Sequence, residues 1–183
     1  SSTTCIVGSA RYSRRFCGTA AQAIDLRIEV PAGSSLKLST VNDGVIDVEG
    51  IAGELELHNT NGGIRVKDAK GPVNANTVNG DIEVEFVQAL GQEPMAFSTL
   101  NGDVDLTLPA GSKFAVRLRS DNGEIYSDFD VALQPKAAKV EEDRGKGKYR
   151  VSIATELTGK VGGGGAELFL KTFNGDIILR RRG

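Results

Sequence analysis

The feature that most constrains this chain is a short motif that occurs six times with the same internal spacing. Each copy has two apolar residues separated by a polar one, then a small polar residue, a turn glycine and a second apolar pair. The turn glycines are Gly44, Gly62, Gly80, Gly102, Gly123 and Gly175, so the steps between copies are 18, 18, 22, 21 and 52 residues. Five of these glycines directly follow an asparagine, namely Asn61, Asn79, Asn101, Asn122 and Asn174.

The residue types in the motif predict strands joined by tight turns. Alternation of apolar and polar residues places one row of side chains in a core and the other in solvent, as in a β-strand. Glycine adopts positive φ without steric cost and asparagine tolerates it, so each Asn-Gly is predicted to turn the chain. Threonine recurs two residues before the turn asparagine, and we expect a ladder of hydroxyl groups at Thr40, Thr77, Thr99 and Thr172.

Two architectures are compatible with this pattern. Asn-Gly between alternating strands also signals a hairpin, so an antiparallel meander is one interpretation. A solenoid explains more, because stacked rungs bring equivalent positions into contact and therefore require the same residue at the same offset. The 52-residue step is predicted to hide degenerate copies, one of them at Val151–Thr155.

We therefore predict an all-β, single-domain solenoid, similar to a parallel β-helix, of roughly eight short rungs and undetermined handedness. Residues 21–183 are assigned to the solenoid, and residues 1–20 to an irregular N-terminal segment or cap. Cys5 and Cys17 both lie in that segment, where either a local disulfide or two free thiols are possible. Their spacing matches no zinc pattern.

Charge and hydropathy exclude some functions. The chain has 22 basic and 24 acidic residues, and this balance gives no electrostatic reason to expect nucleic acid as a partner. No apolar run approaches the roughly 20 residues that span a bilayer, so no transmembrane segment is expected.

Acidic residues recur at two offsets and are the candidate metal ligands. Asp81 and Asp103 directly follow turn glycines, and Glu83 and Asp105 lie two residues further on. Stacking brings members of each pair together, and close carboxylates bind calcium or act as an acid/base pair on polysaccharide. The interpretation that we favour is a solvated surface whose acids cap turns and prevent lateral strand pairing.

Three other features carry weaker signals. His58, the single histidine, lies at an outward offset with no recurring partner, so we expect it in solvent. Gly162–Gly165 lacks the Lys-Ser/Thr of a phosphate-binding loop and is interpreted as a corner. Arg180–Arg182 directly precedes the last residue, Gly183, and we expect it to be either a basic tail or a charged cap on the last rung.

The recurring Thr-x-Asn-Gly-Asp-Ile units, the turn Pro31–Ser34 repeated at Pro109–Ser112, and the closing stretch Leu170–Leu179 resemble a bacterial adhesin-like family. This family is the domain of unknown function 4097, and the resemblance covers roughly residues 24–180. It implies a β-solenoid on the outer side of a membrane, with no established enzymatic activity and no site residues to transfer.

We accordingly expect a non-enzymatic structural or binding module of the bacterial cell envelope, located in the periplasm, on the cell surface or in the medium. Its expected partner is an envelope protein, a peptide or a glycan, and no cofactor is expected. The alternatives are a β-helix enzyme acting on polysaccharide and a scaffold that polymerises end to end. The triple arginine and the atypical first rung argue against polymerisation, so a monomer or weak oligomer is expected.

Overall fold

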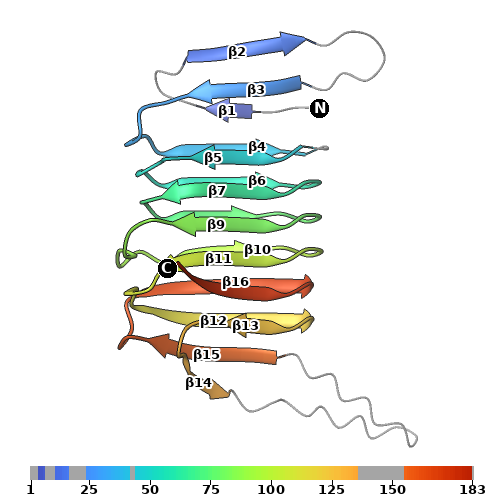
Figure 1. Ribbon diagram of the computed structural model, residues 1–183. Coiled ribbons are helices and arrows are strands. Elements are labelled where there is room, and N and C mark those ends of the chain that lie inside the picture. The colour runs from blue at the N-terminus through green and yellow to red at the C-terminus, as the bar shows by residue number, and fades with distance from the viewer. Residues whose placement is uncertain (1–3, 7–10, 17–23, 42–43, 136–154, 183) are drawn as a thin grey trace, which may run out of the picture.

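The computed structural model describes residues 4–6, 11–16, 24–41, 44–135 and 155–182, which form strands and turns without a helix (Figure 1). The strands in chain order are β1 (Thr4–Ile6), β2 (Arg11–Phe16), β3 (Ile24–Glu29), β4 (Leu36–Thr40), β5 (Ile46–Glu49), β6 (Leu55–Asn59), β7 (Ile64–Ala69), β8 (Val73–Asn76), β9 (Ile82–Phe86), β10 (Met95–Ser98), β11 (Val104–Pro109), β12 (Phe114–Asn122), β13 (Ile125–Ser127), β14 (Ala132–Pro135), β15 (Thr155–Val161), β16 (Ala166–Asn174) and β17 (Ile177–Arg182).

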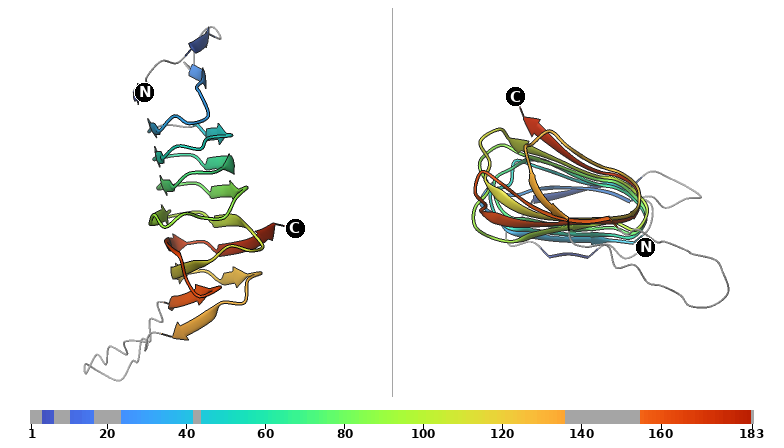
Figure 2. Two further views of the ribbon diagram at one scale, coloured as in Figure 1. Left: turned by 90° about the vertical axis from the view of Figure 1, so that its left-hand side faces the viewer. Right: turned by 90° about the horizontal axis from the view of Figure 1, so that it is seen from below.

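Two sheets face each other along the length of the molecule. One has nine strands in the order β1-β4-β6-β8-β10-β16-β12-β15-β14, and the other has six in the order β13-β17-β11-β9-β7-β5. Each rung contributes one strand to each sheet, and Figure 2 shows the successive rungs stacked as flattened loops. The solenoid prediction is therefore confirmed, and the meander is not what forms. The described residues contain six rungs with two parallel strands each, fewer than the predicted eight.

The core lies between the two sheets and follows from the alternation in the sequence. Strand β6 alternates buried and half-buried residues, and β11 does the same. In one rung, Leu55, Leu57, Ile64 and Val66 are each at most 1 % exposed. A fully buried aliphatic side chain of this size contributes about 1.5–3 kcal/mol of hydrophobic free energy. Burial of these rows is therefore the main force that holds successive rungs together.

The order of the rungs differs from their order in the sequence. Strand β16 lies between β10 and β12, with Leu168 paired to both Met95 and Val116. In the other sheet β17 lies between β11 and β13, and Ile177 is paired with both Val104 and Ile125. The C-terminal rung is thus inserted into the stack, as the red ribbon in Figure 1 shows.

Antiparallel strands extend the stack at both ends. Strand β1 pairs antiparallel with β4 at one end, while β15 pairs antiparallel with β12 and β14 with β15 at the other. The 52-residue step was predicted to hide degenerate copies. The described strands of this step, β14 and β15, are antiparallel and form no further parallel rung. Four of the five residues of the copy named at Val151–Thr155 lie outside the described part of the chain. Positive φ at Gly162, Gly163 and Gly164 reverses the chain between β15 and β16 in a tight turn, so β15 runs opposite to β16 and therefore opposite to β12.

The N-terminal segment is more regular than predicted. It contributes β1 to the nine-stranded sheet, and β2 pairs antiparallel with β3 in a separate two-stranded sheet. Strand pairing with β4 and β3 supplies the hydrogen bonds that order this backbone. Cys17 and the side chain of Cys5 lie outside the described part of the chain, so the disulfide stays a prediction.

Candidate interaction surfaces

The Asn-Gly corner is built around glycines at which any side chain would be strained. Gly62, Gly80, Gly102 and Gly175 have φ between 142° and 149°, a region that favours glycine. A Cβ atom on any of them would lie 2.0–2.4 Å from the carbonyl oxygen of the turn glycine in the neighbouring rung. The predicted turns are therefore correct, and close stacking adds a second requirement for glycine.

The turn asparagines form a continuous side-chain ladder along this corner. In spatial order the Nδ2 of each residue donates to the Oδ1 of the previous one: Asn79 to Asn61 (2.8 Å), Asn101 to Asn79 (2.8 Å), Asn174 to Asn101 (2.7 Å) and Asn122 to Asn174 (3.1 Å). Each asparagine donates to the asparagine of the preceding rung, always in the same direction, so the ladder fixes how successive rungs are aligned.

Thr77, Thr99 and Thr172 of the threonine column are buried and Thr40 is half-buried, but the column does not form the predicted ladder of hydroxyls. Thr77, Thr99 and Thr172 donate instead to the carbonyl oxygens of Gly62, Gly80 and Gly102, at 2.9–3.0 Å. Ser120 and Asn59 make the equivalent bond to Gly175 and Gly44 in their rungs. The prediction failed because the nearest acceptor is the turn carbonyl of the neighbouring rung, not its hydroxyl.

The first pair of candidate metal ligands lies on this corner and bonds the backbone. Asp81 Oδ1 accepts a hydrogen bond from the backbone N–H of Asp103 at 2.9 Å. Asp103 does the same for Asp176 (2.7 Å), and Asp176 for Glu124 (2.8 Å). One oxygen of each of these aspartates thus caps the turn of the next rung, as the favoured interpretation of the acids proposed.

The second pair lies on the outer face of the six-stranded sheet, where each acid faces an arginine. Glu83 is 2.8 Å from Nε of Arg65, and Asp105 is 2.7 Å from Nε of Arg180. These carboxylates raise the pKa of both arginines through the hydrogen bond and the charge. The groove between these side chains encloses about 170 Å³. Within the described ranges, no three His, Cys, Asp or Glu side chains are grouped as a metal site would require.

The C-terminal arginines lie within the stack, so the prediction of a tail or end cap is wrong. Arg182 is 3.1 Å from Glu85, two strands away in β9, and 3.7 Å from Asp68, three strands away in β7. Arg181 donates to the carbonyl oxygen of Asp128 and lies 5.3 Å from the ring centre of Phe129. Insertion of β17 beside β11 brings these charges next to acids of earlier rungs.

His58 lies on the outer face of the nine-stranded sheet, with 45 % of its side chain exposed. Its Nε2 is 3.1 Å from Oε1 of Glu56, which also accepts from Nζ of Lys37 at 2.7 Å. The bond from Lys37, followed by that from His58, lowers the pKa of Glu56. This partner occupies a different offset from His58, which is why the column comparison missed it.

Sequence reasoning missed an exposed apolar column at the Asn-Gly corner. The residue between the threonine and the asparagine of each motif points outward, and four of these are apolar: Val41 (47 % exposed), Val78 (36 %), Leu100 (46 %) and Phe173 (44 %). Val78, Leu100 and Phe173 belong to successive rungs, since the N–H of Asn101 and of Asn174 bond the carbonyls of Val78 and Leu100. The motif does contain a signal for this column: the position is apolar in four copies, although it lies outside the apolar–polar alternation that predicts the core.

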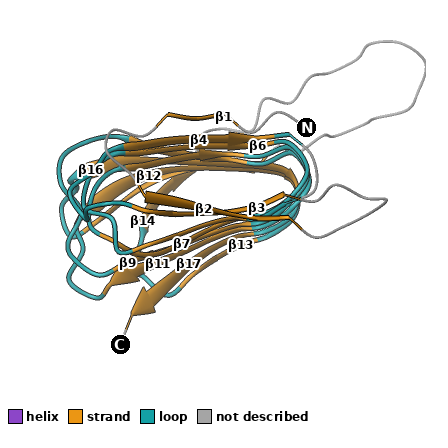
Figure 3. Cartoon of the chain, turned by 90° about the horizontal axis from the view of Figure 1, so that it is seen from above, coloured by secondary structure: helices purple, strands orange, loops and turns teal. Residues whose placement is uncertain are grey.

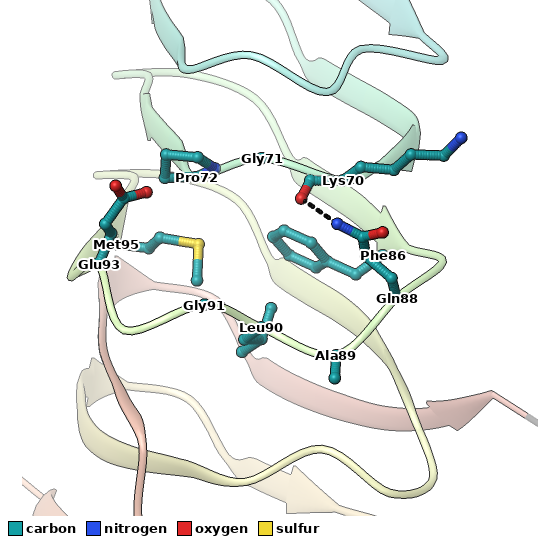
Figure 4. A pocket seen from close by; sticks show the side chains of 10 residues that line it. All are labelled: Lys70, Gly71, Pro72, Phe86, Gln88, Ala89, Leu90, Gly91, Glu93 and Met95. Atoms are coloured by element: carbon teal, nitrogen blue, oxygen red, sulfur yellow. Dashed lines mark hydrogen bonds between the residues drawn. The ribbon is translucent and has the colours of Figure 1, made fainter. Parts of the chain in front are cut away.

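A small cavity lies at the opposite corner, under the longer connection 87–94 (Figure 4). It encloses about 140 Å³ and is lined by Phe86, Leu90 and Met95, with Gln88 closing it by a hydrogen bond to the carbonyl of Lys70. The ionisable residues in its lining are Lys70 and Glu93. It therefore has no pair of carboxylates for glycoside hydrolysis.

The stacked geometry agrees with the comparison with known families. Residues 21–157, about three quarters of the chain, match the model of the family described as Toastrack DUF4097, and the chain belongs to this family. Neither a curated protein nor a solved structure matches the chain significantly. The family is one of unknown function, and β16 and β17 continue its motif beyond the matched residues. In the described part of the chain, no helix is long and apolar enough to cross a membrane.

Proposed function

We propose that this domain is a non-enzymatic binding module of the bacterial cell envelope, which holds a protein or peptide partner against its Asn-Gly corner. The observation that carries the proposal is the column of Val78, Leu100 and Phe173, exposed on three successive rungs. Contiguous exposed apolar side chains on the surface of a soluble protein mark interaction sites.

The surroundings of the column support binding without chemistry. The asparagine and aspartate side chains beside it already bond neighbouring rungs, so the corner is rigid before a partner arrives. A rigid surface loses little conformational entropy on binding. The polar side chains of this corner already bond each other along the stack. A partner therefore gains most free energy by covering the apolar column and removing it from water.

The position outside the cytoplasm is part of the same proposal. It is supported by the location outside a membrane that the resemblance to an adhesin-like family implies, and by the two cysteines of the N-terminal segment. Proteolysis of intact and lysed source cells tests it, with an antibody against the domain. We expect cleavage only after removal or permeabilisation of the outer layers, or in intact cells if the domain is on the surface. Protection until the cytoplasmic membrane is lysed would contradict the proposal.

The partner contact is tested by photo-crosslinking from position 100 in living source cells. We expect a crosslinked envelope species that disappears with Phe173→Ser, a change on the adjacent rung. Thr60→Ser, at the equivalent polar position of another rung, is the matched control and should leave the crosslink unchanged. A crosslink that persists in Phe173→Ser, or is absent from the wild type, would contradict the role of the column.

A further inference from the structure

The five Asn-Gly pairs share a chemical weakness. The backbone nitrogen of the glycine attacks the asparagine Cγ, because glycine has no side chain to hinder the approach. A bond forms between this nitrogen and Cγ, the bond from Cγ to Nδ2 breaks, and ammonia leaves with the amide proton. Water then opens the succinimide ring at either carbonyl and leaves aspartate or isoaspartate. The reaction needs water as its co-reactant and changes no oxidation state.

Four of the five pairs are protected by the stack. The N–H groups of Gly62, Gly80, Gly102 and Gly175 donate to the asparagine carbonyl of the next rung, at 2.7, 2.8, 2.9 and 3.1 Å. A nitrogen whose proton is held in this bond is a poor nucleophile. The asparagine side chains are also restrained, since those of Asn79, Asn101 and Asn174 each donate to one neighbour and accept from another. Attack would require several bonds to break together.

The fifth pair lies at the end of the ladder and lacks these restraints. Among the described residues, the N–H of Gly123 has no acceptor and Oδ1 of Asn122 has no donor. The single bond of the Asn122 side chain is the donation to Asn174, at 3.1 Å the longest step of the ladder. Gly123 is exposed, whereas the other four turn glycines are half-buried.

We infer that Asn122 is a site of spontaneous covalent modification, at which the folded protein loses ammonia and acquires a carboxylate faster than at its other Asn-Gly pairs. The product no longer donates to Oδ1 of Asn174, and a negative charge appears between Asp121 and Glu124. Like charges that lie close together repel each other. The modification therefore weakens the attachment of the terminal rung, including β13, and leaves the interior of the stack unchanged.

The test is to incubate the purified full chain in mildly alkaline buffer and to follow each pair by peptide mass spectrometry. We expect Asn122 to be converted about tenfold faster than Asn79 or Asn101, the factor expected when one or two hydrogen bonds need not break first. The same incubation in concentrated urea is the control, and there the five rates should converge. Equal rates in the folded protein, or a faster reaction inside the ladder, would overturn the inference.

The structural consequence is tested with Asn122→Asp, which mimics one product. Hydrogen–deuterium exchange should accelerate in β13 and stay unchanged in β7, several rungs away. Asn122→Ser is the control for loss of the amide without added charge and should have a smaller effect. If β13 exchanges at the wild-type rate in Asn122→Asp, the modification does not loosen the terminal rung.

Discussion

The two corners of the solenoid reverse the chain in different ways. At the Asn-Gly corner the motif is nearly the same in every rung, and side chains of successive rungs bond each other. At the opposite corner the connections range from residues 70–72 to residues 87–94. Figure 3 shows the first set of loops closely superimposed along the stack and the second set spread apart. Repetition is thus needed only where side chains of neighbouring rungs touch.

This difference explains the uneven steps between the motifs. The turn glycines 62 and 80 are 18 residues apart, whereas 80 and 102 are 22 apart. The extra residues belong to the connection 87–94, where Leu90 folds back over the core. A loop at a surface corner absorbs a change of length at little cost in free energy.

A one-residue insertion should have the largest effect and tests the difference between the two corners most directly. One glycine added between Gly102 and Asp103 shifts β11 by one residue, so Val104 and Leu106 would point to solvent. We expect this variant to lose its cooperative urea transition. The same insertion between Gly91 and Gln92, at the opposite corner, should lower the free energy of unfolding by less than about 1 kcal/mol. Equal tolerance at the two corners would refute the comparison.

The next largest effect is expected for Gly102→Ala. The residue has φ 147°, and a Cβ would lie 2.2 Å from the carbonyl oxygen of Gly80. Backbone strain and overpacking together should lower the free energy of unfolding by about 3 kcal/mol. Gly91→Ala is the matched control, because nothing lies within 4 Å of its added Cβ. Urea denaturation compares the two, and similar losses would mean that the rungs do not stack as described.

Removing one buried hydroxyl should have a smaller effect. Thr99→Val leaves the carbonyl of Gly80 without the donor that now lies 2.9 Å away. An unpaired buried acceptor costs about 1–3 kcal/mol of stability. Thr60→Val, at the half-buried position directly before the turn asparagine Asn61, should change stability by less than about 0.5 kcal/mol. Thermal and urea unfolding both report this difference, and a neutral Thr99→Val would show that the buried bond contributes little.

The outer face of the six-stranded sheet should be less sensitive still. Arg180→Gln removes the contact with Asp105 at 2.7 Å, but both side chains reach solvent. We expect a small loss of stability at low ionic strength that largely disappears in high salt. Lys67→Gln on the same face is the control, because Lys67 forms no ion pair with the described residues. A salt-independent loss would indicate a packing role for Arg180.

The smallest expected effect concerns Glu56. Its pKa is lowered in the folded chain by Lys37 and then by His58, so it binds protons less readily than in the unfolded chain. The resulting stabilisation is present above the unfolded pKa and is lost as the pH falls through the folded pKa. Glu56→Gln should therefore flatten the acid limb of a plot of urea midpoint against pH. An unchanged slope would mean that this cluster does not contribute.

The candidate surfaces show what a repeat pattern can and cannot predict. Asn79, Asn101 and their neighbours were placed at turns because their backbone requirement is local. The partner of Asp105 was not foreseen, since Arg180 is distant in sequence and reaches Asp105 only through strand insertion. The partner of Glu83 lies at the same offset one rung earlier, so the repeat register does contain the signal for Arg65. The apolar column was missed because the residue directly before each turn asparagine lies outside the apolar–polar alternation of the strands.

The sequence by itself determined the shape of one rung: two alternating strands, a glycine turn, and the inward rows that form the core. These features depend on contacts within a rung or between equivalent positions, and the repetition records both. The tertiary structure alone decided the order of the rungs, with β16 and β17 inserted before β12 and β13. Each rung offers the same hydrogen-bonding and apolar groups to its neighbours. The motif therefore does not specify which rung stacks on which. The rung with Ser120 and Glu124 in place of threonine and aspartate lies at the end of the parallel stack, where one face needs no rung of the same kind.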